Sequence, residues 1–121
     1  MITEDYVSFE TAKLLKEKGF NISCRFAYTE KGYEFNTCVC SDIPVYAYKP
    51  TLQMAMKWLR EEHQLFIDLF IFHLDWLWSI YSIDKSIPVN NIPKIIKNSV
   101  SYTSYEEACE AAIKYCLENL V

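Results

Sequence analysis

Apolar side chains recur at helical spacing in three stretches of the chain. The most regular stretch carries a single apolar stripe made of Leu52, Ala55, Met56, Leu59 and His63. Thr51 comes just before this stripe and can cap the first turn, because its hydroxyl oxygen accepts a hydrogen bond from a free backbone N–H. Ser8 and Ser104 precede the other two stretches in the same way, and Gly19 ends the first one. The pattern therefore predicts three helices, over residues 9–18, 51–63 and 104–119.

Between the helices the pattern changes to the alternation of half-buried strands. Residues 22–29 and 33–40 alternate in this way on either side of a short turn that contains Gly32. Two alternating runs joined by a short glycine-containing turn are typical of a β-hairpin. The sequence therefore predicts a first pair of antiparallel strands here.

The most hydrophobic run of the chain covers residues 65–83 and has the length of a membrane-spanning helix. Asp68, His73 and Asp75 lie inside it, however, and carboxylates are costly to place in lipid. The run is also rich in Phe, Ile, Trp and Tyr, which favour strands. We therefore expect two strands that meet near His73. Asp68 lies between two apolar neighbours, so it should either face solvent or have a partner.

The remaining segments carry weaker signals. Residues 41–50 form a predicted loop that contains two prolines, and residues 84–102 either form a functional loop or hide a short strand. The predicted order is α-β-β-α-β-β-α, which gives an α+β fold with an antiparallel sheet of about four strands and helices packed on one face. A chain of 121 residues fits a single domain, 1–121.

Composition narrows the class of protein. A hydrophobic content of 51% excludes disorder, and a net charge of -4 argues against binding to a nucleic acid polymer, which favours a clustered positive surface. The acidic start of the chain lacks the pattern of a secretion signal. Five cysteines without a familiar framework fit reduced thiols. We therefore expect a cytoplasmic protein that does not insert into a membrane.

Three blocks of the sequence resemble a known family. They are Ser8-Phe9-Glu10 through Phe20, then Pro50-Thr51-Leu52-Gln53 through Glu61, and Ser104-Tyr105-Glu106-Glu107-Ala108 through Leu117. They are similar to a family of small proteins abundant in Bacteroidales and in the phages and mobile elements of these bacteria. The Lys57-Trp58-Leu59-Arg60-Glu61 block is the most specific. The resemblance implies a phage or mobile-element origin and a bacterial host cytosol, and it implies no reaction.

Few residues are suited to catalysis or metal binding. The only plausible acid–base set consists of His63, His73, Asp68 and Asp75, with no nucleophile motif beside it. Only two glycines occur, which argues against a P-loop or a dinucleotide-binding loop. The sequence therefore predicts a protein that is not an enzyme and needs no cofactor.

The cysteines are expected to be buried and inert. Cys38 and Cys40 alternate on a predicted strand, and Cys109 and Cys116 share one face of the last helix. We therefore predict no metal site. A zinc site made of Cys38, Cys40 and either His63 or His73 is the alternative.

An aromatic surplus favours binding. The residues expected at half-exposed positions are Tyr28, Tyr46, Tyr48, Trp58, Trp76, Trp78 and Tyr81. The first hypothesis is a phage protein that sequesters a small anionic ligand, such as a host immune nucleotide signal, between aromatic rings and cationic arms. Such pockets often form between copies, so this hypothesis includes a homo-oligomer. Its candidate ligand-binding residues are Arg25, Tyr48, Lys57, Trp58 and Arg60.

The second hypothesis is a protein–protein interaction module without a small-molecule ligand, which would inhibit or adapt a host protein. The same aromatic residues would then form an interface. Convergence of Arg25, Lys57 and Arg60 around an aromatic cleft would favour the ligand, whereas their dispersal would favour the protein partner.

Overall fold

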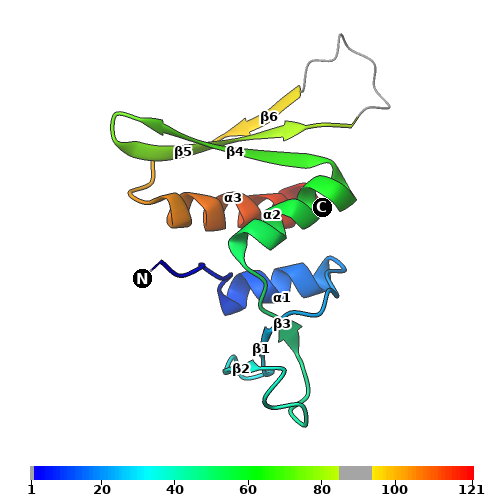
Figure 1. The fold of residues 1–121 in the computed structure, drawn as a ribbon. Coiled ribbons are helices and arrows are strands. Elements are labelled where there is room, and N and C mark those ends of the chain that lie inside the picture. Colours follow the sequence, from blue (N-terminus) through cyan, green and yellow to red (C-terminus); the bar gives the residue numbers. More distant parts are fainter. Residues whose placement is uncertain (1, 85–93) are drawn as a thin grey trace. The chain divides into compact units, whose positions relative to one another are not determined.

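Two three-stranded antiparallel sheets and three helices make up the fold in the computed structural model, which describes residues 2–84 and 94–121 (Figure 1). The α+β class is confirmed, and the element order roughly matches the prediction. The described strands number six, however, and they form two sheets where one sheet of about four was expected. The helices and strands, in chain order, are α1 (Phe9–Glu17), β1 (Phe26–Tyr28), β2 (Glu34–Asn36), β3 (Ala47–Tyr48), α2 (Leu52–His63), β4 (Leu65–Phe72), β5 (Asp75–Ser82), β6 (Lys94–Asn98) and α3 (Tyr105–Asn119).

The chain divides into two compact units. Unit 1 covers Met1–Ala55 and unit 2 covers Met56–Val121. The prediction of a single domain over residues 1–121 stays a prediction.

The helices begin where the sequence predicts. The hydroxyl oxygens of Ser8, Thr51 and Ser104 each accept a hydrogen bond from the backbone N–H three residues later, at 3.3, 3.1 and 3.1 Å. These bonds satisfy N–H groups that have no partner inside the helix. At the other end of α1, Gly19 adopts a φ of 100°, which suits the residue that follows a helix. The three capping predictions are confirmed because they depend on contacts within a few residues.

Unit 1 holds a small sheet in the order β2-β1-β3, and α1 packs against β3. The β1–β2 hairpin is confirmed around Gly32, but β2 ends at Asn36, earlier than predicted. The side chain of Asn36 accepts a hydrogen bond from the N–H of Cys38 at 2.9 Å, and its carbonyl accepts one from the N–H of Cys40 at 3.0 Å. Asparagine side chains favour such turns, so Cys38 and Cys40 do not lie on a strand.

Unit 2 is built around the hairpin of β4 and β5. Leu65 pairs with Ser82 at one end and Phe72 pairs with Asp75 at the other, which confirms two strands over residues 65–83. β6 pairs with β5, so the segment 84–102 does contain a short strand. Residues 85–93 lie outside the described part of the chain. Within residues 2–84 and 94–121, no helix combines the length and apolar character needed to cross a membrane.

Helix α3 packs against β4 and β5 and defines the inner face of this sheet. The rings of Trp76 and Trp78 contact Tyr105 and Tyr115 of the helix, with centroids 5.2 and 5.5 Å apart. Because side chains alternate along a strand, the neighbours of these tryptophans point to the opposite, outer face.

The turn of the β4–β5 hairpin consists of two residues in a left-handed conformation. His73 has a φ of 52° and Leu74 a φ of 72°, as in the type I′ turns that match the twist of a hairpin. Asn and Gly normally occupy these positions, because a side chain in this conformation costs about 1–2 kcal/mol. Leu74 is 92% exposed, so no packing compensates for that cost.

Replacing Leu74 with glycine is expected to raise the free energy of unfolding by about 1 kcal/mol, since glycine adopts a positive φ readily. The variant Leu74→Ala is the control, because it removes the same side chain but keeps a Cβ atom. Urea unfolding of both variants measures the difference. Equal stabilities for the glycine and alanine variants would contradict the prediction.

Candidate functional site

Two of the predicted ligand-binding residues lie in unit 1. Arg25 is exposed just before β1, and its guanidinium group lies 5.5 Å from the centroid of the Phe26 ring. Tyr48 is half-buried in β3, where its hydroxyl oxygen accepts a hydrogen bond from the hydroxyl of Ser23 at 3.2 Å.

The other three predicted residues lie on α2 in unit 2. Lys57 is exposed, Arg60 is half-buried, and Trp58 is 8% exposed with its ring edge-on to His63, the centroids 4.7 Å apart. A buried, edge-packed indole has little free face on which a flat ligand could stack. The five candidates therefore fall in two separate units, and their predicted joint site stays a prediction.

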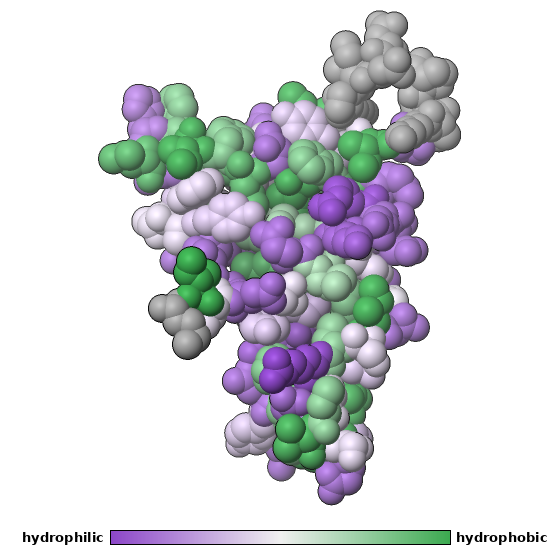
Figure 2. All heavy atoms as spheres, viewed as in Figure 1, coloured by the Kyte–Doolittle hydropathy of each residue, from purple (hydrophilic) through white to green (hydrophobic). Residues whose placement is uncertain are grey.

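Of the seven aromatic residues expected at half-exposed positions, four lie there and three do not. Tyr28, Trp58 and Trp78 are buried rather than half-exposed. Trp78 is buried because it points towards α3, and Tyr28 because its ring packs near Phe9 and its hydroxyl donates to the carbonyl of Val7. Eight of the fourteen exposed large apolar side chains among the described residues lie in unit 2, and six of these belong to β4 and β6. Figure 2 shows such hydrophobic side chains at the turn end of the β4–β5 hairpin, at the left of the view.

These side chains define a candidate site on the outer face of the unit 2 sheet. Phe66 and Phe70 are 38% and 37% exposed, and Phe72 is 60% exposed. The register places Tyr81 opposite Phe66 and Leu77 opposite Phe70. Ile95 of β6 extends the row of Phe66 and Tyr81, because it pairs with Tyr81. We call the set the outer face; its apolar members are Phe66, Phe70, Phe72, Leu77, Tyr81 and Ile95.

A polar row crosses the middle of the outer face. Asp68 pairs with Ser79, and Ser79 pairs with Asn98, so the three side chains follow one another across the three strands. The hydroxyl of Ser79 donates a hydrogen bond to Oδ1 of Asn98 at 2.7 Å. Apolar side chains flank this row on both sides along β4, at Phe66 and Phe70.

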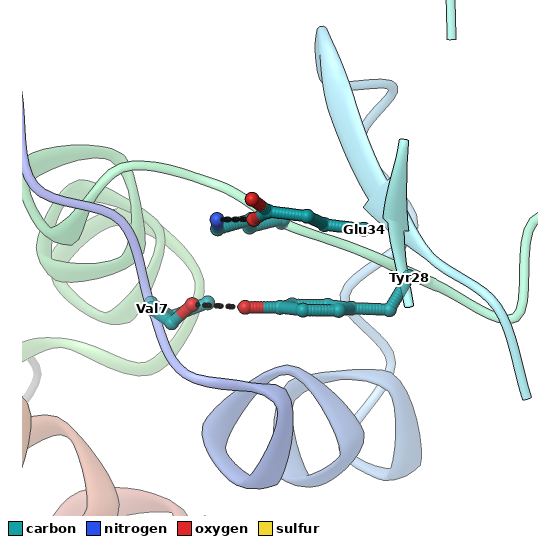
Figure 3. Close-up of polar contacts among 4 residues, drawn as sticks. Val7, Tyr28 and Glu34 are labelled. Atoms are coloured by element: carbon teal, nitrogen blue, oxygen red, sulfur yellow. Dashed lines mark hydrogen bonds and ion pairs between the residues drawn. The ribbon is translucent and has the colours of Figure 1, made fainter. Parts of the chain in front are cut away.

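A second polar cluster lies in unit 1 (Figure 3). The side-chain ammonium of Lys49 forms an ion pair with Glu34 and lies 5.3 and 5.4 Å from the ring centroids of Tyr6 and Tyr28. The hydroxyl of Tyr28 donates to the carbonyl of Val7 at 2.9 Å. These contacts link β1, β2 and the residue that follows β3 to the amino-terminal segment, which gives the cluster a structural role.

The five cysteines differ in burial, and Cys24 and Cys40 are half-buried rather than buried as predicted. Cys109 and Cys116 are fully buried on α3, and burial raises the pKa of each thiol to about 12, with the charges of Glu110 and Glu106 adding to the effect at Cys109. Such thiols are unreactive, as predicted. Cys38 is exposed, so the prediction of burial is wrong there, because the Asn36 turn replaces the expected strand.

The residues considered for catalysis or metal binding are not grouped. His63 packs on Trp58, His73 occupies the hairpin turn, and Asp68 lies in the middle of β4. Among residues 2–84 and 94–121, no three His, Cys, Asp or Glu side chains lie close enough together to hold a metal ion.

Comparison with known proteins adds no assignment. None of the family models, curated proteins or solved structures compared with this chain matches it. The resemblance to a family of Bacteroidales and their phages therefore stays a prediction.

Proposed function

We propose that this protein is a protein–protein interaction module that binds its partner through the outer face of the unit 2 sheet. The observation that carries the proposal is the row of exposed phenylalanines on β4, Phe66, Phe70 and Phe72, on the side of the sheet opposite α3. An origin in a phage or mobile element would make a host protein the natural partner.

The physical argument concerns what antiparallel sheets usually present to water. When one face of such a sheet packs on the core, the other face is normally polar. Here the solvent side carries aromatic and aliphatic side chains, which gain free energy when a partner removes them from water. Contiguous exposed apolar patches commonly mark interaction sites. A partner that covers the outer face would supply that burial.

The ligand-sequestration hypothesis has less support from the geometry. Trp58, its proposed stacking platform, is buried against His63. Native mass spectrometry distinguishes the two functions, because a retained small mass would favour the ligand.

The test of the proposal uses paired variants. We expect the double variant Phe66→Ser and Phe70→Ser to reduce capture of a partner from a Bacteroidales host lysate at least tenfold, since hot-spot aromatics at interfaces contribute about 2 kcal/mol or more. Quantitative mass spectrometry of the captured proteins measures the ratio to the unaltered protein.

Tyr33→Ser is the matched control, because Tyr33 is a 71% exposed aromatic residue that lies in unit 1, outside the outer face. This variant should capture the same polypeptide as the unaltered protein. A partner retained equally by the double variant would contradict the proposal.

A further inference from the structure

The outer face has a carboxyl group at its centre, that of Asp68. Asp68 is half-buried in the middle of β4, and within the described residues of unit 2 its carboxylate makes no hydrogen bond or ion pair. The register places the hydroxyl of Ser79 opposite Asp68, but this hydroxyl donates to Oδ1 of Asn98 at 2.7 Å. Because Asp68 is only half-buried, water can hydrate its carboxylate while the outer face is uncovered.

A partner that covers the outer face must replace this water. An ionised carboxylate moved out of water without a new partner loses several kcal/mol, which would cancel the gain from burying the phenylalanines. A cationic donor placed on Asp68 avoids that loss, because charge-assisted hydrogen bonds are about twice as strong as neutral ones. The Nδ2 group of Asn98, at the other end of the row, can in turn donate to an acceptor of the partner.

From this geometry, which rests on the proposed function, we infer that the partner is a protein segment that presents an arginine or lysine side chain to Asp68. Apolar side chains of that segment would flank the basic residue and pack on the rows of Phe66 and Phe70. These rows lie two residues to either side of Asp68 along β4, or about 7 Å at strand spacing. An extended segment with the pattern apolar-x-basic-x-apolar has the same spacing.

The same charge argues against a second copy of this chain as the occupant. Two outer faces packed against each other around their polar rows would bring two Asp68 carboxylates together in an apolar setting. Like charges in such a position repel, and the side chains named for the outer face in the described part of unit 2 include no cation. The inference therefore specifies a different protein.

The test is a display library of extended 12-residue peptides selected on the full-length protein. The central position of each peptide encodes Arg, Lys, Gln, Leu or Glu in equal shares. The two positions that lie two residues before and after it encode a mixture of apolar residues. We expect peptides with a central Arg or Lys to be enriched about tenfold or more over those with Leu or Glu. The enrichment of a central Arg or Lys should disappear when the library is selected on the variant Asp68→Asn. On the variant Asp68→Lys, peptides with a central Glu should be enriched instead.

The outcomes separate this inference from the proposed function. Peptides that bind regardless of the central residue, and are lost on the variant Phe66→Ser and Phe70→Ser, overturn the inference while the interaction surface stands. If peptides are enriched no more strongly on the unaltered protein than on that double variant, both the inference and the proposed function are overturned. A concentration-dependent dimer of the free protein, abolished by the same double variant, shows that a second copy covers the outer face and also overturns the inference.

Discussion

Replacing Ile80 with alanine is expected to lower the free energy of unfolding by about 3 kcal/mol. Ile80 is fully buried on the inner face of the unit 2 sheet, in β5, the strand between β4 and β6. Truncation of a buried isoleucine loses transfer free energy and leaves a cavity, and such changes cost about 2–5 kcal/mol. Urea unfolding followed by tryptophan fluorescence reports on this unit specifically, because Trp58, Trp76 and Trp78 all lie in it.

The variant Ile95→Ala is the matched control for this experiment. Ile95 lies on the neighbouring strand β6 but on the outer face, where it is 54% exposed. The same substitution should change the stability there by no more than about 0.5 kcal/mol. Similar losses for both variants would mean that α3 does not distinguish the two faces, and would contradict the assignment of the outer face.

The second large effect is a loss of stability in alkaline solution. Burial raises the pKa of the thiols of Cys109 and Cys116 from 9.0 to about 12 in the folded protein. Above pH 9 the unfolded chain releases these two protons, whereas the folded protein still holds them, so the unfolded state is favoured as the pH rises towards 12. We expect the free energy of unfolding to fall by roughly 2 kcal/mol between pH 9 and pH 10 from these two thiols.

The double variant Cys109→Ala and Cys116→Ala isolates this contribution. It lacks both thiols but keeps the tyrosines and lysines that also titrate in this range. Urea unfolding followed by circular dichroism at several pH values compares the slopes for the two proteins. The variant should be less stable at neutral pH and should show the shallower decline above pH 9. Parallel slopes would contradict the burial of these thiols.

The sequence by itself determined the local parts of this fold. Ser8, Thr51 and Ser104 cap their helices through hydrogen bonds that span three residues. The turn at Gly32 and the break between β4 and β5 also depend on a few neighbouring residues. Periodicity and capping describe such short-range contacts well, because no distant segment is needed to form them.

Only the tertiary structure decided which segments pair across long stretches of chain. Ala47 and Tyr48 form a strand only because they pair with β1, about twenty positions earlier in the chain. Two residues show no recognisable alternation, so this strand was predicted as part of a loop. β6 is also short, and it likewise depends on its pairing with β5. The count of strands and their division into two sheets therefore required the structure.

The candidate site shows the same division. Both faces of strand β4 carry apolar side chains, for example Ile67 on one face and Phe66 on the other. The pattern alone therefore does not tell which face packs against the core. The sequence did mark Asp68 as a residue that needs solvent or a partner. The position of α3 makes Trp78 a core residue and leaves the phenylalanines exposed. Side-chain chemistry set what each residue could do, and the packing of one helix determined which face of the sheet was left exposed.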